Sequence, residues 1–212
     1  MKIAIIGATG FVGSALVEEA VSRKHQVSAL VRNVGKVEAK PGVTGVQSDV
    51  TDTATLVGLL AGHDVVISAF NGGWENADIY AKHLAGSRSI AEAAKQAGVR
   101  LITVGGAGSL IAPDGSQFVD GPEFPAAYKD GASAARDALN ELRSGAGLDW
   151  SFVSPPFLLV PGERTGQYRL GLDTPVFNAA GQSTISVADL AVAILDEAET
   201  PRHRNHRFTV GY

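Results

Sequence analysis

Short apolar runs alternate with longer segments of helical spacing along most of this 212-residue chain. An apolar run opens the chain, and further runs of strand length lie at 26–31, 43–47, 63–70, 99–104 and 148–153. Between them, apolar residues recur every three or four positions over 11–24, 52–60, 77–97 and 128–142. Because such a repeat buries its strands between two layers of helices, the pattern predicts a doubly wound, mostly parallel α/β sheet.

The remaining segments are less regular. Residues 158–186 are rich in turn-forming residues with weak β signals, and we expect them to form a small substrate cap. A last amphipathic helix is predicted over 187–199 after the polar Ser186, followed by an edge strand at 206–210. The segment 110–127 is longer than an ordinary strand–helix connection, so it is a candidate lid or substrate loop. No linker or repeat divides the chain, which predicts a single domain over 1–212.

Composition narrows the classes of function. Hydrophobic residues make up 45% of the chain and charged residues 19%, as in a globular domain with a sizeable core. A net charge of −4 gives no general attraction to nucleic acid or to an anionic membrane, and no apolar run approaches membrane-spanning length. The absence of cysteine excludes disulfides and thiol catalysis and favours a reducing, cytoplasmic location.

A metal site is not predicted. His203 and His206 lie among Arg202, Arg204 and Arg207, whose positive charges oppose a divalent cation. We therefore interpret 202–207 as a solvated loop.

Three glycines, Gly7, Gly10 and Gly13, separate the opening apolar run from the first helical segment. In a strand–turn–helix unit the first glycine lets the chain turn, the second lets a ligand approach the backbone, and the third lets the helix pack closely on the strand. The free N–H groups and the positive end of the helix dipole then favour a phosphate anion. The sequence therefore predicts a dinucleotide whose pyrophosphate lies at this turn.

Residues after the second and third strands bear on the rest of the dinucleotide. Arg32 and Asn33 follow the second strand about 20 residues after the glycine turn, where NAD-binding proteins carry an acidic residue for the ribose 2′-hydroxyl. An arginine accommodates a 2′-phosphate, so Arg32, with Lys36 in support, favours NADP; the alternative is a solvated arginine. Asp49, next to Val50, either accepts a hydrogen bond from the adenine amino group or caps the following helix.

Glycine-rich segments also follow the fourth and fifth strands. They are Asn71-Gly-Gly-Trp74 and Gly105-Gly-Ala-Gly-Ser109. Ligands of open α/β sheets bind outside the carboxyl ends of the strands, so two such segments on adjacent strands leave room for a flat ligand. Loop flexibility alone explains either one separately.

These motifs, together with Leu30-Val-Arg-Asn33, Ser68-Ala-Phe-Asn71 and Ser154-Pro-Pro-Phe157, make nearly the whole chain resemble atypical short-chain dehydrogenase/reductases. The nearest resemblance is to NAD(P)H-dependent flavin reductases and biliverdin reductase B-like proteins. It implies that the segments at Phe70-Asn71 and 155–157 lie beside the nicotinamide ribose and carboxamide, and that 105–109 borders the substrate. Alternatively, Pro155-Pro156 merely ends a strand.

The expected cofactor-binding residues are Gly7, Thr9, Gly10, Phe11, Val12, Gly13, Arg32, Asn33, Asp49, Val50, Ala69, Phe70, Asn71, Gly105, Gly106, Pro155, Pro156 and Phe157. The expected substrate contacts are Trp74, Ser109 and Tyr128.

The usual proton donor of short-chain dehydrogenases is missing. Those enzymes use a tyrosine whose pKa is lowered by a lysine four residues later. In this chain Tyr80, Tyr128 and Tyr168 have Leu84, Ala132 and Leu172 at that position, and Tyr212 is the last residue. Tyr128-Lys129 is an adjacent pair, whose side chains point about 100° apart on a helix.

Chemistry without a positioned acid suits hydride transfer to a planar acceptor such as a flavin, a quinone or a linear tetrapyrrole. We therefore expect an NAD(P)H-dependent reductase that prefers NADPH and takes FMN or FAD as a substrate rather than as a bound group. The aromatic residues that could hold the acceptor are Trp74, Phe118, Phe124, Tyr128 and Phe157. The alternative is a non-catalytic redox sensor that binds NAD(P). Either protein would be a monomer or a homodimer, with no nucleic-acid or membrane partner.

Overall fold

The computed structural model describes all 212 residues and confirms the predicted doubly wound α/β fold. Eight strands form the central sheet in the order β3-β2-β1-β4-β5-β6-β10-β8. Their bounds are β1 Lys2–Ile6, β2 Gln26–Val31, β3 Val43–Gln47, β4 Val65–Ser68, β5 Arg100–Val104, β6 Trp150–Ser154, β8 Arg169–Gly171 and β10 His206–Gly211. All neighbouring strands pair in parallel except β8, which is antiparallel to β10.

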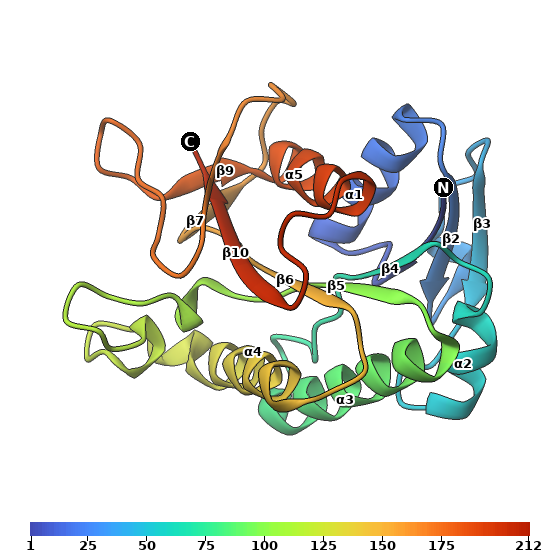
Figure 1. The fold of residues 1–212 in the computed structure, drawn as a ribbon, viewed down its shortest axis with the longest axis horizontal. Helices are drawn as coiled ribbons and strands as arrows, with labels where there is room; N and C mark the ends of the chain where they lie inside the picture. Colours follow the sequence, from blue (N-terminus) through green and yellow to red (C-terminus); the bar gives the residue numbers. More distant parts are fainter.

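Helices cover both faces of the sheet (Figure 1). Helices α1 (Phe11–Ser22) and α5 (Val187–Glu199) lie on one face, and α2 (Thr53–Leu60), α3 (Ile79–Ala97) and α4 (Ala126–Ser144) lie on the other. A cluster of 21 buried apolar residues lies between the first layer and the sheet. A second cluster of 11 lies between the other face of the sheet and helices α2 and α3. Strands enclosed on both sides need apolar residues at successive positions, which explains the continuous apolar runs in the sequence.

The expected edge strand at 206–210 is not an edge strand. Strand β10 lies between β6 and β8, with Phe208 opposite Val153 on one side and Val210 opposite Leu170 on the other. The outer position belongs to the three-residue strand β8, from the segment predicted as a cap. Phe208 and Val210 are fully buried as a result.

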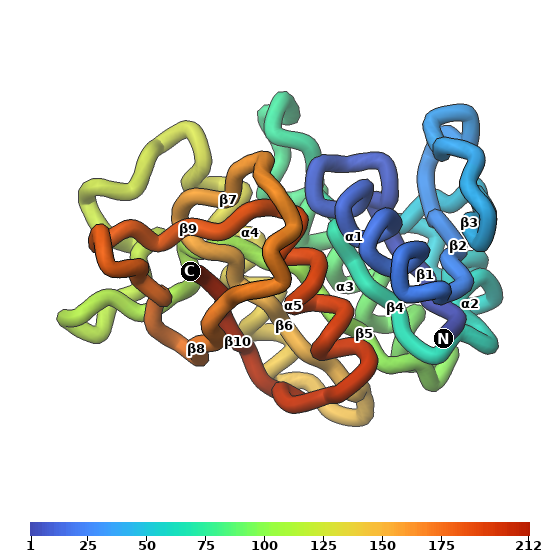
Figure 2. The backbone as a smooth tube through the Cα atoms, turned by 90° about the horizontal axis from the view of Figure 1, so that it is seen from above, coloured from blue at the N-terminus to red at the C-terminus, as the bar shows by residue number.

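The cap segment 158–186 has more structure than its weak sequence signal indicates. Besides β8, it contains β7 (Leu158–Val160) and β9 (Thr184–Ser186), which form a separate two-stranded parallel ladder. Figure 2 shows β7 and β9 beside α5 and β10. The segment 110–127 is a folded connection in which Leu110 and Val119 are fully buried. It includes the 3₁₀ turn η3 (Phe118–Asp120); the other such turns are η1 (Val34–Lys36) and η2 (Ala107–Ser109).

Two buried carboxylates hold the cap against the helices. Glu19 of α1 accepts hydrogen bonds from Arg164 at 2.6 and 2.9 Å and from Arg23 at 2.7 Å. Asp189 of α5 accepts from the backbone N–H of Thr165 at 2.9 Å and from the hydroxyl of Tyr212 at 2.7 Å. No helix of the chain combines the length and apolar character needed to cross a bilayer.

Candidate dinucleotide and acceptor site

The strand order reverses between β1 and β4, and the loops that follow these strands lie side by side. The N–H of Gly7 bonds to the carbonyl of Leu30 in β2 at 3.2 Å, and the N–H of Ala69 bonds to the carbonyl of Ile6 in β1 at 3.0 Å. The glycine turn and the segment from Ala69 therefore meet at the carboxyl edge of the sheet. In open α/β sheets this reversal point is where ligands bind.

Each glycine of the first turn has the geometry expected for its role. Gly7 has a φ of +77°, which favours glycine. A Cβ on Gly13 would lie 2.0 Å from the carbonyl oxygen of Gly7, so only a bare backbone lets α1 approach the turn. A Cβ on Gly10 would have that same oxygen as its sole neighbour, at 3.3 Å, and would otherwise point into open space.

The amino end of α1 fits an anion. Its N-cap residue, Gly10, offers no side chain to the first-turn N–H groups, and that turn contains no acidic residue. The free donors and the helix dipole are thus unopposed, as a pyrophosphate requires. Thr9 and Phe11 are exposed beside this end and Val12 is half-buried.

The structure places the residues predicted for the adenosine half at the ends of β2 and β3. Arg32 is exposed and forms no ion pair, and the side chain of Asn33 accepts a hydrogen bond from the N–H of Gly35 at 3.0 Å. Asp49 does not cap α2; that cap is Asp52, which accepts from the N–H of Thr55 at 3.1 Å. This removes the capping alternative for Asp49, and the half-buried Val50 lies beside it.

Asp49 is held as an acceptor by its own loop. Its carboxylate takes hydrogen bonds from the N–H and hydroxyl of Thr51 at 2.9 and 2.7 Å. These bonds hold the pKa of Asp49 below its ordinary value, and the charge of Arg32 adds a smaller effect in the same direction. The group is therefore an ionised acceptor next to a cation.

The side chain of Phe70, which follows β4, points away from the carboxyl edge of the sheet. The ring of Phe70 lies against Gly86 of α3, where a Cβ would come within 2.3 Å of it, and stacks on His83 at 5.7 Å. Phe70 can therefore reach a cofactor only through its backbone. Asn71 is exposed, and its side-chain oxygen accepts from the N–H of Gly73 at 2.7 Å.

The two glycines after β5 differ. A Cβ on Gly105 would lie 1.9 Å from the ring of Phe152, so the close packing of that ring requires a glycine at this position. A Cβ on Gly106 would have one neighbour, the Cβ of Ala135 in α4 at 3.9 Å. Gly106 is thus the position where an added side chain would enter free space.

The aromatic candidates fall into two groups. Phe157 contacts Phe118 of η3, with ring centroids 4.7 Å apart, and Phe177 of the cap at 6.3 Å. Trp74 and Tyr128 meet edge to face at 5.5 Å, both more than half exposed. Phe177 was missed because its turn-rich surroundings have no periodic pattern.

Other aromatic and proline candidates are packed inward. A Cβ on Gly108 would lie 3.4 Å from the ring of Phe124. Pro155 and Pro156 are buried between the end of β6 and the start of β7, so they separate these strands while Phe157 is exposed.

Ser109 faces the interior, toward an arginine that sequence reasoning missed. Nη1 of the buried Arg207 donates to the carbonyl of Ser109 at 3.0 Å and lies 3.3 Å from its hydroxyl, which is 3.4 Å from that of Ser154. Nε donates to Asp173 in the cap at 2.8 Å. One guanidinium therefore connects the ends of β5 and β6 with the cap.

The interpretation of 202–207 as a solvated loop is wrong for two of its residues. Arg207 is only 3% exposed, and His203 bonds to the buried Glu197 at 2.8 Å. Burial lowers the pKa of Arg207, and the carboxylate of Asp173 opposes this effect. No group of three or more histidine or acidic side chains is arranged to hold a metal ion.

Three of the four tyrosines donate their hydroxyls to carboxylates. Tyr80 bonds to Asp137 at 2.7 Å, Tyr212 bonds to Asp189, and Tyr168 bonds to Asp196. The bond to Asp137 raises the pKa of Tyr80, and burial together with Asp196 raises that of Tyr168. The hydroxyl of Tyr128 has no hydrogen-bond partner in the protein. No phenol is therefore paired with a lysine in the way a short-chain dehydrogenase requires.

The sheet order, the glycine turn and the uncapped amino end of α1 define a Rossmann-type dinucleotide-binding protein. Comparison with known proteins agrees, because the pattern of the NAD(P)H-binding family matches residues 7–198. The chain belongs to this family, which confirms the resemblance seen in the sequence.

Several relatives match the chain over almost its full length. The uncharacterized protein YwnB of Bacillus subtilis (strain 168) is 39% identical, with 99% of this chain and 98% of YwnB covered. A structure from Bacteroides thetaiotaomicron, provisionally named an epimerase, is 41% identical with a TM-score of 0.92, covering 100% of this chain and 96% of its own. One from Streptococcus pneumoniae TIGR4, provisionally named an NADH-flavin reductase, is 36% identical with a TM-score of 0.88, covering 100% and 99%.

Proposed function

We propose that this chain is a reductase that transfers hydride from NADPH to a planar acceptor, such as a flavin, a quinone or a linear tetrapyrrole. One observation carries the proposal: an anion-binding turn built for a dinucleotide lies at a sheet edge where no tyrosine is paired with a lysine. The name given to the Streptococcus pneumoniae relative supports the same reaction class.

The chain's part in this reaction is binding and orientation. The first-turn N–H groups of α1 would hold the pyrophosphate, and Arg32 with Asp49 would hold the adenosine half. The backbone from Ala69 to Asn71 and the bare Gly106 would border the nicotinamide. When bound, NADPH supplies the hydride, and the reduced acceptor takes its proton from water. Alignment of this kind contributes roughly 7–11 kcal/mol to lowering a barrier.

The acceptor would lie against aromatic side chains. Phe157 is 41% exposed and contacts rings from η3 and from the cap, so three separate segments present aromatic surface together. Such a surface suits a conjugated ring system, which gains from edge-to-face and offset contacts. A flavin would act there as an exchanging substrate.

Preference for NADPH follows from Arg32. Its exposed guanidinium has no ion-pair partner and lies one residue beyond β2, where a ribose 2′-phosphate is recognised in this fold. An acidic residue at this position would instead repel that phosphate.

Two other activities are less well supported. Epimerisation, the reaction named for the Bacteroides thetaiotaomicron relative, needs a group that exchanges a proton with the substrate. The phenols of Tyr80, Tyr168 and Tyr212 are engaged by carboxylates. The remaining phenol, that of Tyr128, has no lysine four residues later. A non-catalytic NAD(P) sensor would also lack the tyrosine–lysine pair. It differs from a reductase in giving no turnover.

The test compares two variants in steady-state reduction of FMN and menadione by NADPH. Tyr128→Phe should keep rates within about tenfold of native, because a general acid contributes roughly 10²–10⁴-fold and none is used here. Gly106→Leu should reduce kcat severely, since its side chain would enter the space assigned to the nicotinamide or the acceptor. Gly58→Leu is the control, because a Cβ there has no neighbour within 4 Å. A decrease of about 10³-fold in the rate of Tyr128→Phe would show that Tyr128 acts as a general acid and would refute the proposal.

A further inference from the structure

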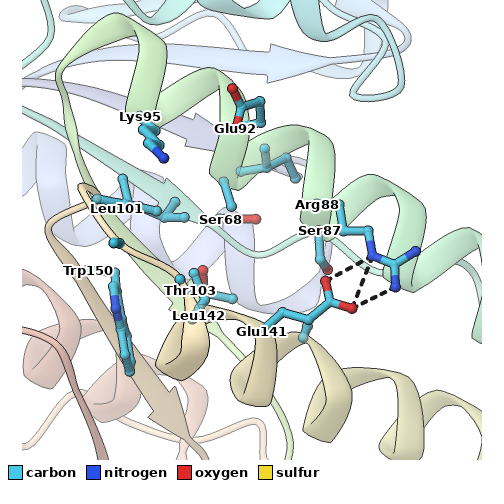
Figure 3. A pocket seen from close by; sticks show the side chains of 16 residues that line it. Ser68, Ser87, Arg88, Glu92, Lys95, Leu101, Thr103, Glu141, Leu142 and Trp150 are labelled. Atoms are coloured by element: carbon cyan, nitrogen blue, oxygen red, sulfur yellow. Dashed lines mark hydrogen bonds and ion pairs between the residues drawn. The ribbon is translucent and has the colours of Figure 1, made fainter.

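A cavity of about 330 Å³ lies between α3 and α4 (Figure 3). No residue of the glycine turn or of α1 lines it. Strands β4, β5 and β6 form its floor, and the carboxyl-terminal halves of the two helices form its walls. Its volume is at the lower end of the range of small-molecule sites, roughly 300–1,000 Å³. The cavity is on the sheet face opposite α1, and none of its lining residues is among those expected to bind the dinucleotide.

The lining is mainly apolar, and two of its hydroxyl groups come from the floor. Leu101, Leu142 and Trp150 supply apolar surface, and Ser68 and Thr103 lie at the ends of β4 and β5. Neither hydroxyl donates a hydrogen bond to the protein, although that of Ser68 accepts a long one of 3.4 Å from the N–H of Phe70. Both are thus free to donate to a ligand.

The charged groups at the rim of the cavity differ in whether they have a partner. Arg88 and Glu141 neutralise each other through a bidentate contact at 2.6–3.0 Å. Glu92 accepts a hydrogen bond from Gln96 at 2.7 Å. The ammonium group of Lys95 has no hydrogen bond or ion pair to the protein, and Figure 3 shows it directed toward the cavity. A single cation is therefore left at an apolar cavity.

We propose that this cavity binds a small monocarboxylic acid with an apolar body, as a second site distinct from the NAD(P) site. The carboxylate pairs with Lys95, the apolar body lies against Leu101, Leu142 and Trp150, and the hydroxyls of Ser68 and Thr103 donate to the ligand. A monoanion fits better than a phosphate dianion, because one unpaired cation is available and Glu92 lies at the same rim.

Trp150 provides the readout. The chain has two tryptophans, so Trp74→Phe leaves Trp150 as the single fluorophore. In this background, 4-phenylbutyrate should give a saturable change in Trp150 emission, confirmed by calorimetry, and saturating NADPH should not displace it. The neutral analogue 4-phenylbutanol should bind roughly tenfold more weakly, because it lacks the charge-assisted contact.

Two variants separate charge from shape. Lys95→Met should weaken 4-phenylbutyrate binding roughly tenfold while leaving 4-phenylbutanol unchanged. Ala91→Phe should fill the cavity and abolish binding of both, since Ala91 lines it from α3. Circular dichroism and native NADPH affinity in each variant establish that the fold and the first site are intact.

Three results would overturn the proposal. They are no saturable binding of 4-phenylbutyrate, binding that Lys95→Met leaves unchanged, and displacement by NADPH. The proposal would also be overturned if the native protein sedimented as a dimer and Ala91→Glu converted it to a monomer. That result would place a second copy of the chain over the cavity.

Discussion

The substitution Gly10→Val separates cofactor binding from folding. Gly10 has a φ of −83° and a ψ of 175°, which valine adopts without strain, and the new Cβ would meet only the Gly7 carbonyl oxygen, at 3.3 Å. Glycine is preferred over valine at an N-cap, so we expect a loss of about 1 kcal/mol in folding free energy. For a chain of this size that lowers Tm by about 2–4 °C.

The effect on NADPH should be much larger. The valine methyl groups would occupy the space in front of the first-turn N–H groups and keep the pyrophosphate away from them. Loss of two hydrogen bonds to a charged group, at about 1.5–3 kcal/mol each, amounts to about 3–6 kcal/mol. This corresponds to a decrease in affinity of roughly a hundredfold to ten-thousandfold.

Calorimetric titration with NADPH, together with thermal unfolding, measures both quantities. Gly58→Val is the matched control, because it adds the same side chain to an exposed helical glycine with no neighbour within 4 Å and should leave affinity unchanged. Gly13→Ala is the opposite case: its Cβ would lie 2.0 Å from backbone, so the fold itself should suffer. Native affinity in a folded Gly10→Val protein would refute the assignment of the pyrophosphate.

Two further outcomes are expected. Arg32→Asp should lower NADPH affinity roughly ten- to a hundredfold and reverse the preference over NADH in parallel titrations, and equal binding of both cofactors by the native chain would remove its basis. Burial alone would raise the pKa of Glu19, but hydrogen bonds from Arg164 and Arg23 bring it below 4.5. The resulting stabilisation is complete above about pH 4.5 and is lost as the pH falls through the folded-state pKa. Glu19→Gln should therefore lower the free energy of unfolding by about 1–3 kcal/mol at pH 7. Below pH 4.5 the Tm of the variant should fall less steeply with pH than the Tm of the native protein. Parallel curves of Tm against pH for the two proteins would contradict this.

The periodicity of the sequence predicted those features of the fold that depend on residues close together in the chain. The strand–helix alternation and the glycine turn follow from residues close together in the chain, and both agree with the structure. The inner position of β10 did not follow, because it depends on pairing with the three-residue strand β8, about 35 residues earlier. A strand that short leaves almost no periodic signal.

Residues whose role depends on distant partners were also beyond sequence reasoning. Arg207 looks like one more cation in a basic run, and only the fold places it beneath Ser109 and beside Asp173. Gly105 looks like a ligand-facing glycine, but the ring of Phe152 requires it. The amino-acid type at these positions is compatible with several roles, and tertiary contacts select among them.

Anaerobic oxidation of NADPH by the native protein tests the proposed reaction most directly. NADPH is followed at its own absorbance while FMN, menadione or biliverdin is supplied in turn, with Gly10→Val as the control that lacks the cofactor site. We predict saturable oxidation of NADPH, matched one for one by reduction of at least one acceptor and absent in the control. Tight NADPH binding with no turnover of any acceptor would contradict the reductase assignment and favour a sensor.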